Sequence, residues 1–258
     1  MLIHVNRDEL LRLSKQAALA VPKSAEVIEL RGIHVEADAR RSMLTLTATN
    51  QEIAIQASMG AVVEQSGSMV MDARLLPSIL ALLPEETLDM ELGDGDIYEM
   101  GLAGKSIVFW SGTLLFSARL MAGKYPDTKM LLEKFQSKYS VSLAAEELVS
   151  AINAVSPVME TEGIRIGISF GEHEIHISAE TKQGTASAPV KALVLNGADR
   201  PFYYNYKILL KYLRLVSGSV TLDFDANGLL AVRAGATQYI QSPLRPPKEA
   251  AAQSQQAA

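Results

Sequence analysis

The spacing of apolar residues along this chain changes from segment to segment and predicts helices and strands in a fixed order. In four segments apolar residues recur every three or four positions, which is typical of a helix with one buried face. These predicted helices cover residues 10–21, 75–84, 144–155 and 204–218. Elsewhere apolar and polar residues alternate or β-branched residues cluster, which is typical of strands. The predicted strands cover residues 32–37, 43–50, 52–65, 68–71, 88–94, 97–104, 106–112, 114–120, 139–143, 163–170, 174–180, 184–195, 201–204, 220–226, 229–235 and 238–244.

The predicted elements occur in the order helix, strands, helix, strands, and this order occurs twice. The second helices of the two halves begin near Ala73 and Tyr206, an offset of 133 residues (206 minus 73). Runs of consecutive strands favour antiparallel sheets with helices on one face over a parallel βαβ array. We therefore predict an α+β fold of two duplicated domains, at residues 1–136 and 137–246, followed by a disordered tail at 247–258 that lacks core-forming residues.

Residues at the predicted helix ends fit this assignment. Asn6 precedes the first helix and has the side chain of an N-cap, and Pro22 is expected to stop that helix. Asp72 is expected to cap the second helix, where Pro77 lies early enough to be tolerated. Glu146 and Glu147 open the third helix, where carboxylates suit the positive end of the helix dipole, so we expect a structural role for both.

Composition narrows the class of protein. The chain has 258 residues, 48% of them hydrophobic, so it can bury a sizeable core. It has no cysteine, which excludes disulfides, thiolate nucleophiles and cysteine zinc sites. No window approaches eighteen consecutive apolar residues and the N-terminus lacks the pattern of a signal peptide, so we expect a cytoplasmic protein without a membrane partner. The formal charge of −5 argues against polyanion binding by the whole surface, yet it allows a local basic lining.

A search for catalytic or metal-binding motifs favours a non-enzymatic protein. His173 and His176 lie in a predicted strand and are expected to point to opposite faces, so we expect no metal site there. Asp94 and Asp96 are interpreted as part of a hairpin turn at Asp94-Gly95. Trp110 is interpreted as a sheet or interface side chain. There is no phosphate-binding loop, dinucleotide fingerprint or nucleophile elbow, and we predict no catalytic residue and no cofactor.

The fourth predicted helix has three cations on one face. Lys207, Lys211 and Arg214 are spaced i, i+4 and i+7, which places their side chains in one stripe. Leu209 and Leu213 repeat the same spacing on another face. Taken alone, such a stripe is most simply a solvated helix surface, and an interface with a polyanion is the alternative.

Six segments, in order along the chain, resemble the bacterial sliding clamp family, the beta subunit of DNA polymerase III. They are MLTLTATNQEIAI, MDARLLPSILALLPEE, LLFSARLMAGKYPD, EGIRIGIS with EIHISAE, FYYNYKILLKYLRLVSG and YIQSPLR. Together they cover almost the whole chain up to Arg245. The resemblance implies a ring whose helices surround duplex DNA while the sheets face outward, and it implies a processivity factor without catalytic activity.

The chain departs from this family in three respects. Family subunits typically have three such domains, and this chain has room for two, of which the first resembles a composite of the family's first and second domains. If a six-domain ring is kept, three copies are needed, which predicts a homotrimer. The family's Thr-Asp-Gly-His-Arg-Leu is replaced by the six residues of 49–54, TNQEIA, and the chain continues beyond the closing strand into a tail. We therefore expect a client motif that differs from the usual one.

The resemblance implies two sets of site residues. Cations that would face DNA without reading its sequence are Arg12, Lys15, Lys23, Arg74, Lys207, Lys211 and Arg214. A pocket for peptides of polymerases and clamp loaders would involve Leu30, Pro126, Met130, Leu131, Asn205, Ile208, Ile240, Ser242, Pro243, Leu244 and Arg245. The third helix contains no cation, which puts its place in a DNA-facing layer in doubt.

Three hypotheses follow for the function. The first is a DNA sliding clamp that encircles duplex DNA and binds client peptides. The second is a clamp-derived protein that no longer encircles DNA and acts as a peptide-binding or regulatory module. The third is an enzyme on the same duplicated scaffold. The two strands that would have to pair to close a ring carry no diagnostic residues, so the sequence does not decide between the first two.

Overall fold

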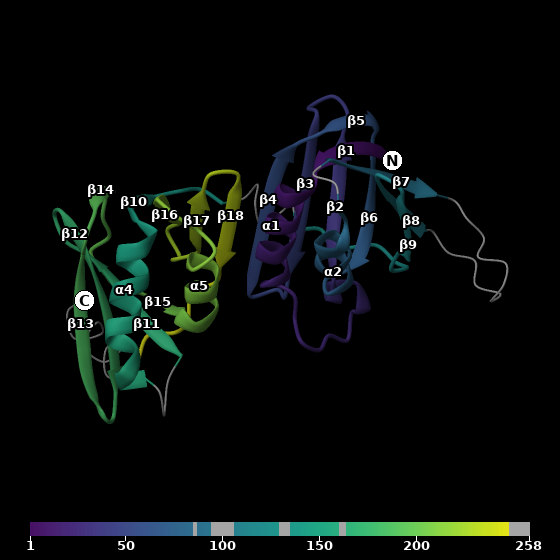
Figure 1. Ribbon diagram of the computed structural model, residues 1–258. Helices are drawn as coiled ribbons and strands as arrows, with labels where there is room; N and C mark the ends of the chain where they lie inside the picture. The colour runs from purple at the N-terminus through teal and green to yellow at the C-terminus, as the bar shows by residue number, and fades with distance from the viewer. Residues whose placement is uncertain (85–86, 94–105, 129–134, 160–163, 248–258) are drawn as a thin grey trace. The chain divides into compact units, whose positions relative to one another are not determined.

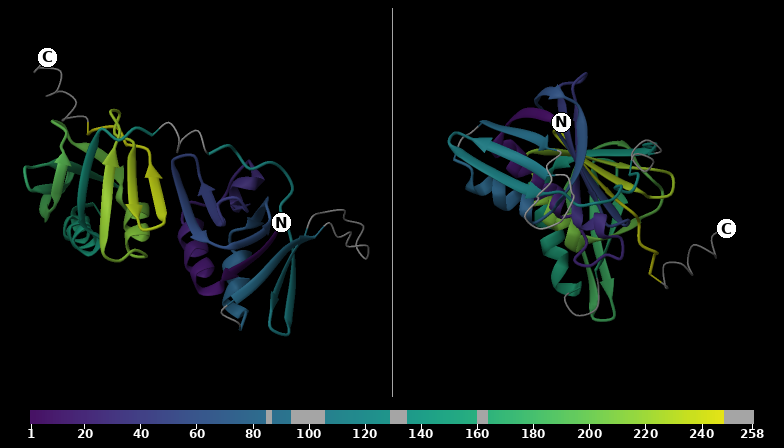
Figure 2. Two further views of the ribbon diagram at one scale, coloured as in Figure 1. Left: turned by 90° about the horizontal axis from the view of Figure 1, so that it is seen from above. Right: turned by 90° about the vertical axis from the view of Figure 1, so that its right-hand side faces the viewer.

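The computed structural model describes residues 1–84, 87–93, 106–128, 135–159 and 164–247. Its contacts divide the chain into two units, Met1–Leu132 with Ala236–Gln238, and Glu133–Gly235 with Tyr239–Ala258. Each unit consists of helices packed on antiparallel sheets (Figures 1 and 2). The strand predicted at 97–104, the Asp94-Gly95 turn and the tail from residue 248 onward lie outside the described residues.

The first unit has the following elements in chain order: β1 (Leu2–Asn6), α1 (Arg7–Ala18), η1 (Ile28–Arg31), β2 (Gly32–Asp38), β3 (Met43–Thr49), β4 (Ile53–Gly60), β5 (Val62–Gln65), β6 (Gly67–Asp72), α2 (Leu75–Leu82), β7 (Thr87–Gly93), β8 (Ser106–Ser111) and β9 (Leu114–Arg119). Two sheets form, with strand orders β5-β1-β7-β8-β9 and β4-β3-β2-β6. Helix α1 packs on β3 and β4 and beside α2.

The second unit repeats this arrangement with β10 (Tyr139–Ala144), α4 (Ala145–Val155), η3 (Ser156–Met159), β11 (Arg165–Phe170), β12 (Glu174–Thr181), β13 (Gly184–Lys191), β14 (Leu193–Asn196), β15 (Phe202–Asn205), α5 (Tyr206–Leu213), β16 (Ser219–Phe224), β17 (Leu230–Ala234) and β18 (Thr237–Gln241). Its strand orders are β14-β10-β16-β17-β18 and β13-β12-β11-β15. Each strand therefore has the same neighbours as its counterpart in the first unit. The predicted α+β fold with an internal duplication is confirmed.

The core of the first unit lies between the helices and the inner faces of both sheets. On β1 and along most of β2 and β4 every second residue is buried, as expected where one sheet face packs on helices and the other is less covered. Fully buried side chains come from both sheets and both helices, namely Ile3, Leu10, Leu13, Ile33, Leu44, Leu46, Ile55, Leu76, Leu80, Leu88 and Phe109. Burial of one such aliphatic side chain contributes roughly 1.5–3 kcal/mol.

Aromatic side chains fill part of the second unit's core. The rings of Phe202 and Phe224 stack 5.5 Å apart, and Phe170 meets Phe224 edge to face at 5.2 Å. The Tyr204 ring is buried nearby, and its hydroxyl donates a hydrogen bond of 2.6 Å to the carbonyl of Gly228. These contacts tie β11, β15 and β16 together across the two sheets of the unit.

The first two helices start at their predicted caps, whereas three helices end earlier than predicted: the second ends at Leu82 and the fourth at Leu213. The Asn6 side chain accepts a 2.9 Å hydrogen bond from the backbone of Glu9, and Asp72 accepts from the backbones of Arg74 and Leu75 at 2.8 and 3.1 Å. The first helix was predicted to run to Pro22 but ends at Ala18. The following residues make i to i+3 hydrogen bonds, so the last turn tightens before the proline is reached.

Two predicted strands are wrong, since each is two strands that belong to different sheets. The run 52–65 divides into β4 and β5, and the run 184–195 divides into β13 and β14. A single residue, Ala61 in the first unit and Ala192 in the second, separates the two strands of each run. Side-chain alternation continues across so short a break, so periodicity alone does not reveal that the chain changes sheet.

An ion pair stabilises the second unit between β16 and β17. Asp223 is 3% exposed, and its carboxylate lies 2.6 Å from the guanidinium of Arg233. Ser137, in the segment before β10, donates a 2.9 Å hydrogen bond to the same carboxylate. No helix in the described part of the chain is long and apolar enough to cross a membrane.

Candidate functional site

Helix α5 presents the predicted cationic stripe to solvent. It begins at Asn205, whose side chain accepts a 3.1 Å hydrogen bond from the backbone of Lys207. Its apolar side chains, Leu209, Leu210, Tyr212 and Leu213, are buried. Lys207, Lys211 and Arg214 are all exposed. The buried apolar face therefore fixes the orientation of the helix and leaves the three cations on the outside.

The charges of this stripe are largely uncompensated. Lys207 and Lys211 form no ion pair among the described residues. Arg214 donates a 3.2 Å hydrogen bond to the Asn153 amide on α4, which orients the guanidinium without neutralising it. Three positive charges at helical spacing raise the local potential even though the chain as a whole is acidic.

The neighbouring helix α4 adds carboxylates to the second unit. Glu146 accepts a 3.0 Å hydrogen bond from the backbone of Gly218, which follows α5. This hydrogen bond lowers the pKa of the Glu146 carboxyl. The contact ties the start of α4 to the loop after α5, in agreement with the structural role expected for Glu146.

The predicted cations of the first unit are exposed but less concentrated. Arg12 lies 3.8 Å from the Glu9 carboxylate on α1, and Lys15 lies one turn further along the same helix. Lys23 follows α1, and Arg74 is the N-cap residue of α2. The exposed face of α2 is apolar and includes Leu82, which is 71% exposed. The stripe on α5 is therefore the densest set of helix cations in the part of the chain that the structure describes.

The predicted peptide-pocket residues fall into both units. In the second unit, the segment after β18 runs beside β15, because the Leu244 backbone donates a 2.7 Å hydrogen bond to the Tyr203 carbonyl. Gln241 donates a 3.1 Å hydrogen bond to the carbonyl of Asn205. The structure therefore brings the closing segment, which includes Ser242, Pro243, Leu244 and Arg245, close to Asn205 at the start of α5.

Burial differs among these residues. Ile240 is 2% exposed and Leu30 is 5% exposed, so both are core side chains. Ile208 and Pro126 are half-buried. Leu30 and Pro126 belong to the first unit, and Met130 and Leu131 lie outside the described residues. The pocket as a whole stays a prediction.

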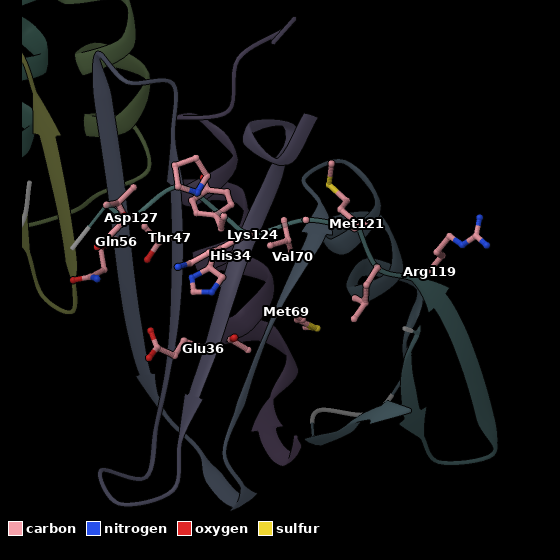
Figure 3. A pocket seen from close by; sticks show the side chains of 17 residues that line it. His34, Glu36, Thr47, Gln56, Met69, Val70, Arg119, Met121, Lys124 and Asp127 are labelled. Atoms are coloured by element: carbon pink, nitrogen blue, oxygen red, sulfur yellow. The ribbon is translucent and has the colours of Figure 1, made fainter. Parts of the chain in front are cut away.

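A cavity of about 970 Å³, which no sequence pattern predicted, lies in the first unit. It lies on the outer face of the β4-β3-β2-β6 sheet and is bounded by residues 119–128, which leave β9 (Figure 3). One cross-strand row forms part of its floor, made of Gln56, Thr47, His34 and Val70. The alternation of polar and apolar residues at positions 34–36 of β2 indicates that His34 and Glu36 share the outer face of the sheet. No sequence pattern predicts that residues 119–128 lie over that face.

The bounding segment is anchored at two points. The Met121 backbone donates a 2.9 Å hydrogen bond to the Val70 carbonyl on β6. The Tyr125 ring stacks on the His34 ring, with 5.4 Å between centroids and 12° between planes. The buried Tyr125 hydroxyl accepts a 3.0 Å hydrogen bond from the backbone of Thr49, and burial raises the pKa of this phenol to about 12. Pro126, from the predicted peptide pocket, lines this cavity.

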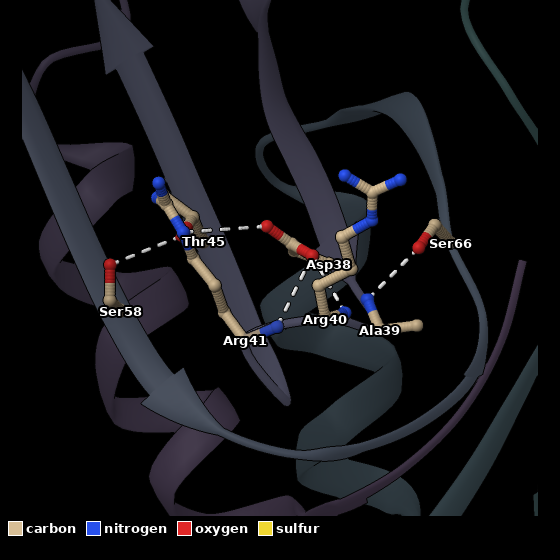
Figure 4. Close-up of polar contacts among 7 residues, drawn as sticks. All are labelled: Asp38, Ala39, Arg40, Arg41, Thr45, Ser58 and Ser66. Carbon is tan, nitrogen blue, oxygen red and sulfur yellow. Dashed lines mark hydrogen bonds and ion pairs between the residues drawn. The ribbon is translucent and has the colours of Figure 1, made fainter.

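The turn between β2 and β3 presents two further cations (Figure 4). Asp38 accepts hydrogen bonds of 2.9 and 3.3 Å from the backbones of Arg40 and Arg41, and it pairs with the Arg41 guanidinium at 3.7 Å. Ser66 accepts a 2.9 Å hydrogen bond from the backbone of Ala39. These contacts fix the conformation of the turn. Since two exposed arginines face one carboxylate, that of Asp38, the turn carries a net positive charge.

His4 connects three strands of the first unit through carboxylates. Its Nε2 lies 2.8 Å from the Glu64 carboxylate on β5, and its Nδ1 contacts the Asp89 carboxylate on β7. Hydrogen bonds to Glu64 and then to Asp89 raise the pKa of His4. The His4 imidazole therefore links β1 to both of its neighbouring strands, β5 and β7.

The structure corrects the expected place of one histidine. His173 lies in the turn before β12, not on the strand, while His176 on β12 pairs with Glu174 at 3.1 Å. Within the described ranges, no group of three or more His, Cys, Asp or Glu residues is arranged to hold a metal ion. Trp110 is half-buried on β8.

Comparison with curated proteins and family models relates this chain to sliding clamps. Residues 1–107 match the family model of the DNA polymerase III beta subunit, N-terminal domain. The beta sliding clamp of Synechococcus elongatus is 29% identical over 133 residues, covering 52% of this chain and 32% of that relative. The beta sliding clamp of Bacillus subtilis is 23% identical over 222 residues, covering 84% of this chain and 56% of that relative. The chain thus spans about a third to just over half of these relatives' length.

Solved structures share the fold. The DNA polymerase III beta subunit of Thermotoga maritima superposes with a TM-score of 0.83 at 16% identity, over 96% of this chain and 66% of that one. The Bacillus subtilis sliding clamp superposes with a TM-score of 0.82 at 21% identity, over 96% and 65% of the two chains. The shared fold is that of the solved clamps, and the described chain contains two duplicated units of it. This chain is therefore similar to the DNA polymerase III beta subunit, the bacterial sliding clamps, in the sequence of residues 1–107 and in fold.

Proposed function

We propose that the protein is a sliding clamp, a non-enzymatic processivity factor that encircles duplex DNA in the cytoplasm and tethers a polymerase. The observation that carries this proposal is the uncompensated stripe of Lys207, Lys211 and Arg214 on the outer face of α5 in a duplicated clamp fold. Cations that meet phosphates without contacting base edges bind DNA independently of its sequence, as sliding requires. Arg12, Lys15, Lys23 and Arg74 supply additional, weaker positive charge from the first unit.

Ring closure is proposed to use one edge strand from each unit. In the described part of the chain, β9 is the last strand of a first-unit sheet and β13 is the last strand of a second-unit sheet. Exposed Leu114 and Leu115 on β9 supply apolar surface for such a contact. A head-to-tail contact of this kind closes into a ring, and three two-domain copies provide six domains.

Peptides of a polymerase and of a clamp loader are proposed to bind near the closing segment. The contacts of Gln241 with Asn205 and of Leu244 with Tyr203 support this, because they bring the residues of 242–245 next to the start of α5. Half-buried Ile208 and Leu244 would offer apolar contact and Arg245 a polar anchor. The replacement of the family's His and Arg within residues 49–54 favours a client motif that differs from the usual one.

The proposal is tested by topology and by mass. Light scattering should give three times the mass of the chain, and particle images should show a central hole. After loading by an ATP-dependent clamp loader, the protein should stay on circular DNA and leave the same DNA once it is linearised. A persistent monomer at high concentration would refute the ring and would favour a non-encircling, peptide-binding descendant of the clamps.

The role of the stripe is tested by charge reversal. Lys207→Glu, Lys211→Glu and Arg214→Glu together should weaken DNA binding and lower the slope of log K against log salt by up to about 2.7 per copy, since each phosphate contact contributes roughly 0.9. The matched control reverses three exposed cations of the same unit that lie outside the helices, Lys182, Lys191 and Arg200. Equal loss in both triple variants would show that net charge, not the stripe, governs binding.

A further inference from the structure

A second, smaller cavity lies at the equivalent place in the second unit. It has a volume of about 240 Å³ on the outer face of the β13-β12-β11-β15 sheet. One cross-strand row in its lining is Ser187, Ser178, Gly167 and Tyr203. Strand by strand, this row corresponds to the row Gln56, Thr47, His34 and Val70 in the cavity of the first unit. The fold has therefore duplicated a groove along with its domains.

The two grooves differ in how far a segment of the chain covers them. In the first unit, the segment that is anchored by Met121 on Val70 continues until the Tyr125 ring covers His34. In the second unit, Leu244 makes the equivalent backbone hydrogen bond to Tyr203, and the described chain reaches the rim of the groove at Pro247. The counterpart of His34 is a glycine, Gly167, so no side chain fills that position.

The groove of the second unit has charged walls. Arg165, Glu180 and the Tyr203 phenol line it together with hydroxyl groups of Ser178, Thr185 and Ser187. Arg165 and Glu180 form no ion pair with each other or with another described residue, and the Arg165 Nε is buried without a hydrogen-bond partner. A buried guanidinium nitrogen that lacks an acceptor costs free energy unless a ligand supplies one.

The surroundings of Tyr203 show that both charges act on the same space. Desolvation raises the pKa of the Tyr203 phenol, Glu180 raises it further and Arg165 opposes the change. The Tyr203 phenol, the Arg165 guanidinium and the hydroxyls of Thr185 and Ser187 are donors that fit a carboxylate, whereas the Ser178 hydroxyl donates to the Gly167 carbonyl. Glu180 can accept from a peptide amide or a basic side chain.

We propose that this groove binds an extended peptide of another polypeptide, with an acidic side chain paired to Arg165. The first unit provides the template, because residues 121–128 cover the equivalent face there and carry Lys124 and Asp127, a base and an acid. The charges in the groove are complementary to such a segment. This binding site involves none of the cations of α5, so its test is independent of DNA binding. Thr185 and Ser187 lie on β13, the edge strand proposed for ring closure, so the mass of each reporter variant by light scattering separates loss of peptide binding from loss of the ring.

The chain contains no cysteine, which allows a single reporter to be placed in the groove. Ser187→Cys places an environment-sensitive fluorophore on the exposed lining of the cavity, and Lys191→Cys places the same fluorophore further along β13, outside the lining. The probe is a synthetic peptide with the sequence of residues 120–128, LMAGKYPDT, and the matched peptide carries Asn in place of Asp127.

We expect the fluorescence of the Ser187→Cys reporter to change saturably with peptide concentration. The fluorescence of the Lys191→Cys reporter should stay constant. The Asn peptide should bind at least about tenfold more weakly, and Arg165→Gln should reduce affinity for the Asp peptide by a similar factor, because a hydrogen bond to a charged group is lost. Circular dichroism of each variant checks that it is folded. Thr185→Val removes a hydroxyl from the lining and keeps Arg165, so it should weaken peptide binding by a smaller factor than Arg165→Gln.

Three outcomes would overturn the proposal. One is equal affinity for the Asp and Asn peptides, which would remove the role of Arg165. Another is no saturable signal from the Ser187→Cys reporter. The third concerns a variant truncated after Pro247. If truncation changes the reporter signal and only the truncated variant binds the peptide, the chain's own end occupies the groove.

Discussion

Replacement of Tyr125 by phenylalanine isolates one hydrogen bond that fixes the segment over the first unit's sheet. The Tyr125 ring is 7% exposed and stacks on His34, and a phenylalanine ring keeps that stacking. The hydroxyl, however, accepts a 3.0 Å hydrogen bond from the backbone N–H of Thr49, which is itself 3% exposed. Tyr125→Phe therefore leaves a buried donor without an acceptor.

The expected cost follows from that unpaired donor. An unsatisfied buried polar group costs about 1–3 kcal/mol, so Tyr125→Phe should lower the free energy of unfolding by about 2 kcal/mol. Tyr125→Leu should cost about 0.5–1.5 kcal/mol more, because the ring stacking on His34 is lost too. The difference between wild type and Tyr125→Phe should shrink as pH rises from about 10 to about 12, since burial raises the pKa of the Tyr125 phenol to about 12 and the folded state therefore loses stability over this range.

Urea unfolding measures these differences, and hydrogen exchange of the Thr49 amide locates them. In Tyr125→Phe that amide should exchange faster, while amides of β16 in the second unit should be unchanged. A Tyr125→Phe variant within about 0.5 kcal/mol of wild type, with an unchanged Thr49 amide, would refute the assignment of this hydrogen bond as a stabilising contact. The same result would weaken the use of this segment as a template for peptide binding.

Three further predictions concern local contacts. His4→Gln should destabilise the first unit at pH 5.5 but not at pH 9. The His4 pKa is raised in the folded state, so its stabilising contribution is present below the pKa of the unfolded chain and is lost as pH rises through the pKa of the folded protein. Thermal unfolding across this pH range measures the difference. Gly123→Ala should cost about 1–2 kcal/mol in urea unfolding, because the φ of +107° strains a residue that carries a Cβ. Gly60→Ala, where a Cβ would meet nothing within 4 Å, should be neutral. Arg233→Gln should cost about 2 kcal/mol by the same assay, less than the roughly 3–5 of a fully buried pair, because Arg233 is 53% exposed beside buried Asp223.

The order and type of the elements could be predicted from the sequence because the signals are local. Apolar spacing predicts a helix within residues 204–218, which contains α5, and such spacing depends on neighbours within one or two turns. The same reasoning places strands along both halves and detects their duplication. It fails at Ala61 and Ala192, where the chain changes sheet within one residue, because sheet membership depends on partners far away in the sequence.

The sequence by itself determined the cationic stripe on α5, since helical spacing alone sets which side chains share a face. Only the tertiary structure decided that two equivalent grooves exist, because each depends on a segment laid over strands that are distant in the chain, as Met121 is laid on Val70 and Leu244 on Tyr203. It also decided that Arg165 has a buried nitrogen without a partner, which no local pattern reports. Local periodicity fixes the exposed face of a helix, whereas a cavity is defined by side chains that only folding brings together.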